Sequence, residues 1–448
     1  MTKNRIFKTG RHMLSLDNWR KRLIFWFGAV IVGAIAAGYA FIADYAQKLF
    51  SDFVTYSAFL PLILSPVIFA AAAWLTAKFC PGAVGSGIPQ AIAARVAQSP
   101  EERRYLLGPR IIIGKILFTT LGLLGGASIG REGPTVQVGA AILYLGASFG
   151  KVNAETSRSL ILAGAAAGVA AAFNTPLAGI VFAIEEMARA FEHRYSGVVL
   201  TAIVLAGASS LSILGNYSYF GFADGGFSLS RDWLTVAVVG GVGGLLGGLF
   251  SKILTDGAPR LYAMLKNRGL FHPAVFAGLC GLIIAGLGYA THGATYGSGY
   301  AQANALLHGE STGSWGYTIA KFFATAISGF SGLPGGIFSP SLSVGAGLGA
   351  SMAPWFPSTP VAGVVLLGMT AYFAGVTQAP ITAFIIVLEI SGRQSLPVPL
   401  IAASVIAVAV SRIICPVSLY HALASHFIVA MKKPEDEQKT AEQKEAVA

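Results

Sequence analysis

The sequence predicts an all-α polytopic membrane protein, and three observations support this fold class. First, 54% of the 448 residues are hydrophobic and only 11% are charged, whereas an average soluble domain carries roughly 25% charged residues. Second, the apolar residues gather into many runs separated by short polar connections. Third, two polar motifs of one half of the chain return in the other half. Together these features exclude a soluble domain.

The basic residues are concentrated ahead of the first apolar run and in short connections. The net charge is +11, but Lys and Arg do not form one basic face, so we expect no nucleic-acid partner. The positive-inside rule places the basic segment 1–22 in the cytoplasm, with an interfacial helix around Leu14–Arg22. The apolar run 23–43 exceeds the ~7–15 residues of a signal-peptide core, and therefore predicts a retained helix.

The apolar runs set the expected order of helices. Several runs are long enough to cross a membrane, but others are only about 12–16 residues and are interrupted by Gly or Pro, which is too short for a ~30 Å core. Short, interrupted segments in matching places predict a binding site made of broken helices. The runs are 23–43, 57–78, 110–129, 135–149, 159–173, 176–187, 197–214, 233–254, 272–291, 316–330, 341–355, 360–376, 380–391 and 397–414.

Two blocks of sequence reveal an internal duplication. Residues 130–140 match residues 336–346 at five positions, and residues 173–185 match residues 377–389 in the same order. We therefore expect a first membrane repeat over 23–225 and a second over 226–430. Periodicity alone leaves open whether the repeats are parallel or inverted. The segment 431–448 has no apolar face and is predicted to be a disordered cytoplasmic tail.

The most unusual polar stretch is Gly130-Arg131-Glu132-Gly133-Pro134. A charged side chain at membrane depth costs at least ~2.5 kcal/mol, so it is rarely kept without a partner or a function. The glycines allow close approach of the backbone to a ligand, and a proline suits the first turn of a helix. The stretch predicts a loop that feeds a helix N-terminus, where an anion and a carboxylate compete for one place.

Three further polar features lie at the ends of apolar runs. Gly85-Ser86-Gly87-Ile88-Pro89 offers a hydroxyl and backbone N–H groups at a positive helix end, although an ordinary N-cap serine on a loop is the commoner explanation of such a motif taken alone. Gly335–Pro340 offers successive backbone amides, or simply a tight turn. Tyr420 could donate its hydroxyl to an ion, although an interfacial anchor is the commoner role of such a tyrosine.

Cysteine and histidine usage gives no sign of a metal site or of an enzyme. Cys80, Cys280 and Cys415 are widely spaced, which fits neither a disulfide framework nor a metal pattern. None of the seven histidines pairs with another at metal-ligand spacing, and the glycine-rich stretch Gly293–Gly299 lacks an obvious base. We therefore expect no metal, no cofactor and no enzymatic activity. A sodium-coupled carrier would explain broken helices but not the three motifs.

The order of these motifs on a duplicated membrane chain resembles the CLC family of chloride channels and chloride/proton antiporters, in its prokaryotic type without cytoplasmic regulatory domains. The resemblance extends from the basic segment to Tyr420. It implies a CLC-like fold of about 18 helices, arranged as two inverted repeats of broken, tilted helices. It also implies a homodimer in the bacterial inner membrane, with both termini cytoplasmic and a separate anion path in every subunit.

The resemblance assigns anion-binding roles by motif position. Ser86 and Tyr420 would donate hydroxyls to a central chloride, and the backbone N–H groups of Ile337 and Phe338 would complete that site. An outer anion site would use backbone amides of the two loops around residues 131–133 and 337–339, which contain Arg131, Gly133 and Ser339. Serine at position 86 implies chloride, because nitrate-preferring relatives carry proline there. Gln90 departs from the glutamate of many members.

The resemblance also assigns the titratable and basic residues. Glu132 would be a gate whose carboxylate occupies an anion position when charged and leaves it when protonated. Lys115 would raise the potential near the pore, unless it merely caps a helix. Glu186 would be the internal proton-transfer residue, with Glu185 beside it on the water side. A solvated helix end also explains such a glutamate pair, and we expect Glu389 of the second repeat to be solvated.

The presence of both Glu132 and Glu186 favours secondary active chloride/proton antiport. A passive voltage- or pH-gated chloride channel of the same fold is the alternative. Chloride and protons are then the transported ions, and membrane lipid surrounds the protein.

Overall fold

A computed structural model provides the structure of this chain and describes residues 16–150, 152–188, 196–215, 219–221, 232–269, 272–392, 397–429 and 431. The predicted boundary between the repeats at residues 225 and 226, most of the basic segment and almost all of the predicted tail lie outside these residues.

The described residues form helices joined by short loops, with two isolated β-bridges. The helices of the first half are α2 (Leu16–Tyr56), α3 (Pro61–Phe79), α4 (Ile88–Val96), α5 (Pro100–Leu107), α6 (Pro109–Leu124), α7 (Glu132–Phe149), α8 (Ala154–Phe173), α9 (Pro176–Phe182) and α10 (Ser196–Leu214). A π-helical segment, Ala183–Ala188, extends α9.

The second half follows the same plan. Its helices are α11 (Trp233–Lys252), α12 (Ala258–Asn267), α13 (Pro273–Ala290), α14 (Tyr300–Leu307), α15 (Trp315–Phe330), α16 (Phe338–Met352), α17 (Val361–Thr377), α18 (Pro380–Ile390) and α19 (Pro397–Ile414). A last helix, Leu419–Val429, carries Tyr420. The predicted all-α fold class is confirmed, and seven of the described helices are long and apolar enough to cross a membrane.

Helix boundaries differ from the sequence prediction at the start of the chain. The expected interfacial helix at Leu14–Arg22 and the first apolar run are not separate, because α2 continues without a break over Leu16–Tyr56. The sequence analysis also missed helices that are short or polar, such as α5 and α12. Helix α5 begins with a capping box, in which Ser99 and Glu102 bond each other's backbone N–H, and this pattern was visible in the sequence.

The duplicated motifs produce duplicated helix pairs. Helix α7 packs along α8, and its counterpart α16 packs along α17. A Cβ on Gly139 would lie 2.3 Å from the carbonyl oxygen of Gly164, and a Cβ on Gly345 would lie 2.6 Å from that of Gly368. Helix pairs in membranes approach closely where small residues meet. The same glycine contact therefore joins the helix pair in both halves.

Helices α9 and α18 show that the halves run in opposite directions. The carboxylate of Glu185 accepts hydrogen bonds from the N–H groups of Ile381 (3.0 Å) and Thr382 (2.6 Å), at the start of α18. The carboxylate of Glu389 accepts from Leu177 (3.1 Å) and Ala178 (2.7 Å), at the start of α9. Each helix therefore ends beside the start of its counterpart, as inverted repeats require.

This reciprocal arrangement corrects one expectation. Glu389 is not a solvated helix end, because both of its carboxylate oxygens bind backbone N–H groups of α9. A carboxylate at a helix N-terminus satisfies unpaired N–H groups and interacts favourably with the helix dipole.

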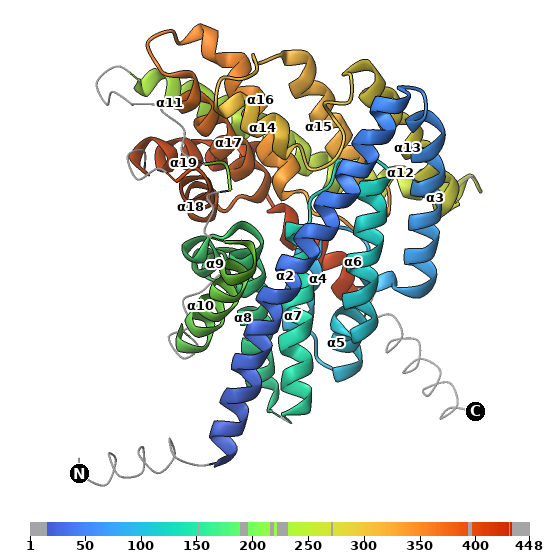
Figure 1. The fold of residues 1–448 in the computed structure, drawn as a ribbon, viewed down its shortest axis with the longest axis vertical. Helices are drawn as coiled ribbons and strands as arrows, with labels where there is room; N and C mark the ends of the chain where they lie inside the picture. Colours follow the sequence, from blue (N-terminus) through green and yellow to red (C-terminus); the bar gives the residue numbers. More distant parts are fainter. Residues whose placement is uncertain are drawn as a thin grey trace, which may run out of the picture.

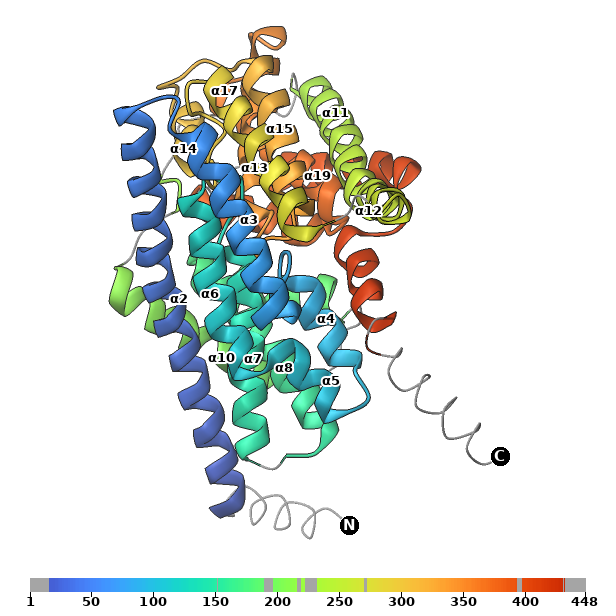
Figure 2. The same ribbon diagram turned by 90° about the vertical axis from the view of Figure 1, so that its right-hand side faces the viewer.

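Figure 1 shows α9 and α18 adjacent near the middle of the long axis. Figure 2 shows α6 beside the long helix α2, and α3 beside α6.

Candidate anion and proton pathway

The three glycine-rich loops that the sequence singles out meet in space. Gly130 and Gly336 exchange two backbone hydrogen bonds of 2.7 Å. Gly85 donates to the carbonyl of Leu333 and accepts from the N–H of Gly335, both at 3.0 Å. Helices α4, α7 and α16 start at these loops. Three helix N-termini, each with unpaired backbone N–H groups, are thereby brought to one place in the protein.

Glycine is required where these loops touch. A Cβ on Gly133 would lie 2.5 Å from the hydroxyl oxygen of Ser86, and a Cβ on Gly87 would lie 2.7 Å from the carbonyl oxygen of Gly133. Gly87 also has a φ of +107°, a conformation that L side chains rarely adopt. The loops that carry Ser86 and Glu132 therefore pack backbone against backbone.

The hydroxyls of Ser86 and Tyr420 lie in the interior beside these loops. The two groups are close enough to interact, and neither oxygen has a hydrogen-bond partner of normal geometry among the described residues. The ring of Phe338 stacks on that of Tyr420, with centroids 6.1 Å apart and planes inclined by 16°. Two buried, unsatisfied hydroxyls cost free energy unless a ligand accepts their hydrogen bonds. Their arrangement suits an anion.

Backbone amides extend the same surface. Ile337 precedes α16 and Phe338 is its first residue, so the N–H groups of Phe338 and Ser339 belong to the first turn. Such N–H groups have no partner within their helix and favour negative charge. Ile337 and Phe338 are both buried. These positions are the ones at which the sequence places the amides of the central and outer anion sites.

The carboxylate of Glu132 already lies against the predicted outer site. It interacts with both the hydroxyl and the backbone N–H of Ser339. Its Oε2 atom has no hydrogen-bond partner among the described residues. The hydroxyl of Ser339 lies 3.2 Å from that of Tyr219, a buried residue that the sequence analysis did not identify. A carboxylate thus occupies a cradle that is equally suited to an anion.

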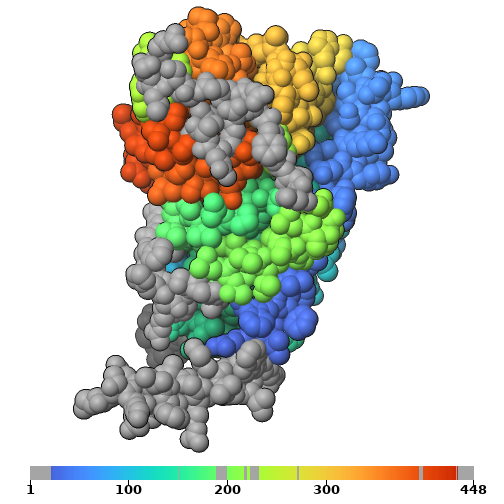
Figure 3. Space-filling model, turned by 60° about the vertical axis from the view of Figure 1, so that its left-hand side comes forward, coloured from blue at the N-terminus to red at the C-terminus, as the bar shows by residue number. Residues whose placement is uncertain are grey.

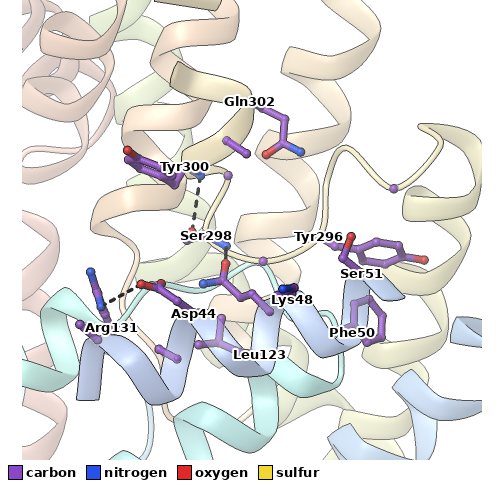
Figure 4. A pocket seen from close by; sticks show the side chains of 18 of the residues that line it. Asp44, Lys48, Phe50, Ser51, Leu123, Arg131, Tyr296, Ser298, Tyr300 and Gln302 are labelled. Carbon is purple, nitrogen blue, oxygen red and sulfur yellow. Dashed lines mark hydrogen bonds and ion pairs between the residues drawn. The ribbon is translucent and has the colours of Figure 1, made fainter. Parts of the chain in front are cut away.

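Glu132 and Arg131 border a vestibule of about 800 Å³. The Nη1 atom of Arg131 lies 3.5 Å from Oδ2 of Asp44 on α2, and the arginine side chain is 11% exposed against 65% for the aspartate. Figure 4 shows Arg131 turned toward Asp44, with Ser298 on the neighbouring loop and Tyr300 at the start of α14. The vestibule therefore connects the Glu132 carboxylate to open space.

Lys115 is buried and holds the Ser86 loop. Its Nζ donates to the carbonyl oxygens of Ala83 (2.8 Å) and Gly85 (2.5 Å). Lys321, its counterpart in the second half, donates in the same way to Thr295 (2.9 Å) and Gly297 (2.8 Å). This shared contact gives Lys115 a structural role in its loop, and the electrostatic role toward the pore remains a prediction.

The second lysine reveals another copy of the Ser86 loop. Gly297-Ser298-Gly299 and the following Gln302-Ala303 repeat the pattern of Gly85–Ala91, and both glycines of each loop have positive φ. The repetition was visible in the sequence but was missed, because it lies at a different offset from the other matches. In this copy the N–H of Ser298 donates to Oε1 of Gln47, at 2.8 Å.

Gln90 now has a structural explanation. Its Oε1 accepts from the N–H of Gly87 (3.0 Å), which caps α4, while its Nε2 donates to the carbonyl oxygens of Gly82 and Val84. An ionised glutamate could accept the first bond but could not make the second. The amide therefore ties the start of α4 to the chain ahead of the Ser86 loop.

Glu186 lies apart from the three loops, in the π-helical segment Ala183–Ala188. Its side chain is 4% exposed, and Oε1 lies 3.3 Å from Nδ1 of His421. Its neighbour Glu185 instead binds the start of α18. Within the described ranges, no group of three or more His, Cys, Asp and Glu side chains gathers as a metal site would require.

The chain is similar to known ion transporters along most of its length. The family model described as voltage gated chloride channel matches residues 68–412. The H(+)/Cl(-) exchange transporter ClcA of Vibrio vulnificus is 31% identical over 384 residues, covering 79% of this chain and 78% of that protein. A protein of the same name from Yersinia pestis is 31% identical over 413 residues, covering 88% and 81%.

Solved structures show the same relationship. A slow cyanobacterial Cl-/H+ antiporter superposes with a TM-score of 0.79 at 26% identity, covering 92% of this chain and 98% of that one. A CLC-type fluoride/proton antiporter superposes with a TM-score of 0.76 at 26% identity, covering 90% and 96%. The motifs, the duplicated helices and these similarities lead to one conclusion: this chain belongs to the voltage gated chloride channel family, the CLC family.

Proposed function

We propose that this chain is a secondary active chloride/proton antiporter, with Glu132 as the gate of its anion path. The observation that carries this function is the position of Glu132. Its carboxylate lies against the backbone N–H and hydroxyl of Ser339, and the buried hydroxyls of Ser86 and Tyr420 have no hydrogen-bond partner of normal geometry among the described residues. The same hydrogen-bond donors can therefore bind either the Glu132 carboxylate or a chloride ion, one after the other.

Exchange follows from this competition. When Glu132 is ionised, its carboxylate holds the amides at the start of α16 and excludes a chloride ion from them. Protonation removes the charge, so the side chain loses these charge-assisted hydrogen bonds. Chloride then takes the outer site and moves to the central site at Ser86 and Tyr420. Each release of the Glu132 proton returns the carboxylate and closes the path.

A second carboxylate gives protons a separate route. Glu186 is buried and lies close enough to Tyr420 for its carboxylate to act electrostatically on the tyrosine hydroxyl. A carboxyl group inside a membrane protein is costly to bury, so it is rarely kept without a function. Glu186 therefore supports coupled antiport over a passive channel. The antiporters named among its relatives and structural neighbours favour the same activity.

Parallel recordings of chloride and proton flux in proteoliposomes test this function. A chloride gradient should drive protons in the opposite direction, and Glu186→Gln should abolish proton movement. Chloride flux without any proton signal in the wild type would leave only the channel. Fluoride in place of chloride belongs in the same assay, because one structural neighbour is described as a fluoride/proton antiporter. The Ser86 and Tyr420 hydroxyls lead us to expect faster chloride transport.

We also propose that the protein sits in the bacterial inner membrane as a homodimer, with both termini cytoplasmic. Helices α9, α10, α18 and α19 share one face, on which Figure 3 shows the green first-half helices directly below the red second-half helices. The face exposes Leu177, Val204, Ile381 and Val405. The partly exposed carboxylates of Glu185 and Glu389 also border it. Lipid solvates such groups poorly, whereas a second copy would cover them.

A further inference from the structure

We infer that His421 is a proton-relay residue that passes protons between solvent and Glu186; this inference rests on the proposed antiport function. His421 directly follows Tyr420 on the helix Leu419–Val429. Its Nδ1 atom lies 3.3 Å from Oε1 of Glu186. The helix that supplies the hydroxyl of the central anion site therefore also supplies a titratable group to the predicted proton route.

Exposure separates the two partners. The Glu186 side chain is 4% exposed and that of His421 is 21% exposed. The imidazole thus touches the buried carboxylate at one nitrogen while part of the ring remains accessible. A proton acceptor that is nearly sealed from water needs such an intermediate, because each transfer requires donor and acceptor within hydrogen-bond reach.

Histidine suits this task chemically. An imidazole ring has two nitrogen atoms, so it can carry a proton on either one and can act both as a proton donor and as a proton acceptor. In the uptake direction the imidazolium gives its Nδ1 proton to the Glu186 carboxylate, which becomes a neutral carboxylic acid. The neutral ring, which still carries its Nε2 proton, then accepts a proton at Nδ1 from a hydronium ion, which leaves as water, and returns to the imidazolium. Release runs through the same steps in reverse, so no other reactant is needed.

The polar and charged groups around His421 and Glu186 do not displace the contact between them. Ser418 Oγ lies 3.3 Å from the same Nδ1 atom and can support the neutral ring. On α4, Arg95 donates to the carbonyl of Met187 at 2.7 Å, which places a positive charge near the segment. Glu185 is turned toward α18, and the hydroxyl of Tyr420 is close enough to Glu186 and to Ser86 to interact with both.

The experiment compares His421→Gln with His426→Gln in the full-length protein. His426 lies on the same helix and is exposed, so it controls for histidine loss on that helix. We expect His421→Gln to slow coupled exchange roughly ten-fold, less than the ~100-fold or more of a fully required acid–base group, because water can substitute in part. The deficit should grow as pH rises, and added imidazole should restore part of the rate in His421→Ala.

A second background separates a relay from a structural role. In Glu132→Ala, chloride should move without protons, so adding His421→Gln should leave its chloride flux unchanged. An equal loss of chloride flux in that background would show that His421 only supports Tyr420 and would overturn the relay. Wild-type exchange at all pH values in His421→Gln would also overturn it. An absence of proton coupling in the wild type would instead refute the antiport function itself.

Discussion

At the scale of residues, the proposed gate depends on a few atoms around Glu132. Its carboxylate interacts with the hydroxyl and N–H of Ser339, and its place in the chain beside Gly133 brings it next to the Ser86 loop. The acid is present in only one of the two duplicated loops, because the matching position in Gly336–Pro340 is Phe338. The cradle is thus common to both halves, and only one half can be titrated.

Removing the charge of the gate should uncouple transport. We expect Glu132→Gln to give chloride flux that no longer varies with pH, since no carboxylate competes for the amides of α16. Proton movement should be lost at the same time. Simultaneous chloride-electrode and pH-electrode traces measure both outcomes, and Glu155→Gln, a change at the start of α8, provides the control. Persisting proton transport would contradict the assignment.

Gly133 should not tolerate a side chain. In Gly133→Ala the new Cβ would lie 2.5 Å from Ser86 Oγ and 2.8 Å from its carbonyl oxygen, so the Ser86 hydroxyl must move. Overpacking of this kind costs about 1–3 kcal/mol, which we expect to appear as a roughly ten-fold weaker chloride affinity. Isothermal titration calorimetry measures it. Gly38→Ala is the matched control, because no atom lies within 4 Å of that Cβ.

At the scale of elements, a buried lysine donates hydrogen bonds to the loop ahead of α4 and another does so to the loop ahead of α14. Lys115 and Lys321 each bind two loop carbonyl oxygens. Sequence reasoning placed Lys115 near the pore but could not detect this contact, because the lysine and its acceptors are about 30 residues apart. In both loops the ammonium group of a buried lysine thus donates to carbonyl oxygens that are not paired within a helix.

Replacing each lysine by methionine separates structural from electrostatic effects. Lys321→Met removes the donor of two buried carbonyl oxygens, whereas after Lys115→Met the carbonyl of Gly85 still accepts from the N–H of Gly335 and only that of Ala83 loses its donor. Each carbonyl left without a donor costs about 1–3 kcal/mol, so we expect both variants to lose thermal stability in detergent, and Lys321→Met to lose more. If Lys115 also attracts anions, only Lys115→Met will weaken chloride binding in calorimetry. Equal chloride affinity in both variants would leave the structural role alone.

At the scale of the molecule, the proposed dimer interface is the face of α9, α10, α18 and α19. We expect Val204→Lys, a charge at the centre of this face, to convert dimers into monomers in light scattering, because a buried, unpaired charge is strongly unfavourable. Val67→Lys on α3 is the control, since Val204 and Val67 are equally exposed, at 61%. Dimers that persist in Val204→Lys would place the interface on another face.

The sequence by itself determined the helical membrane fold and the duplication, and it predicted the residues of the proposed gate. These properties depend on local composition and on motifs such as Gly130–Pro134, which report directly on helix starts and on charge at membrane depth. It also identified Ser86, Glu132 and Tyr420 as candidate site residues, because polar groups are rare in so apolar a chain.

Only the tertiary structure decided which of these groups meet. Gly85 pairs with Pro334, Glu389 caps α9, and His421 reaches Glu186, although each pair is separated by more than 200 residues of chain. No periodicity encodes such contacts, because they arise from the packing of two inverted halves and not from either half alone. For this reason Glu389 was wrongly expected to be solvated, and His421 was not noticed.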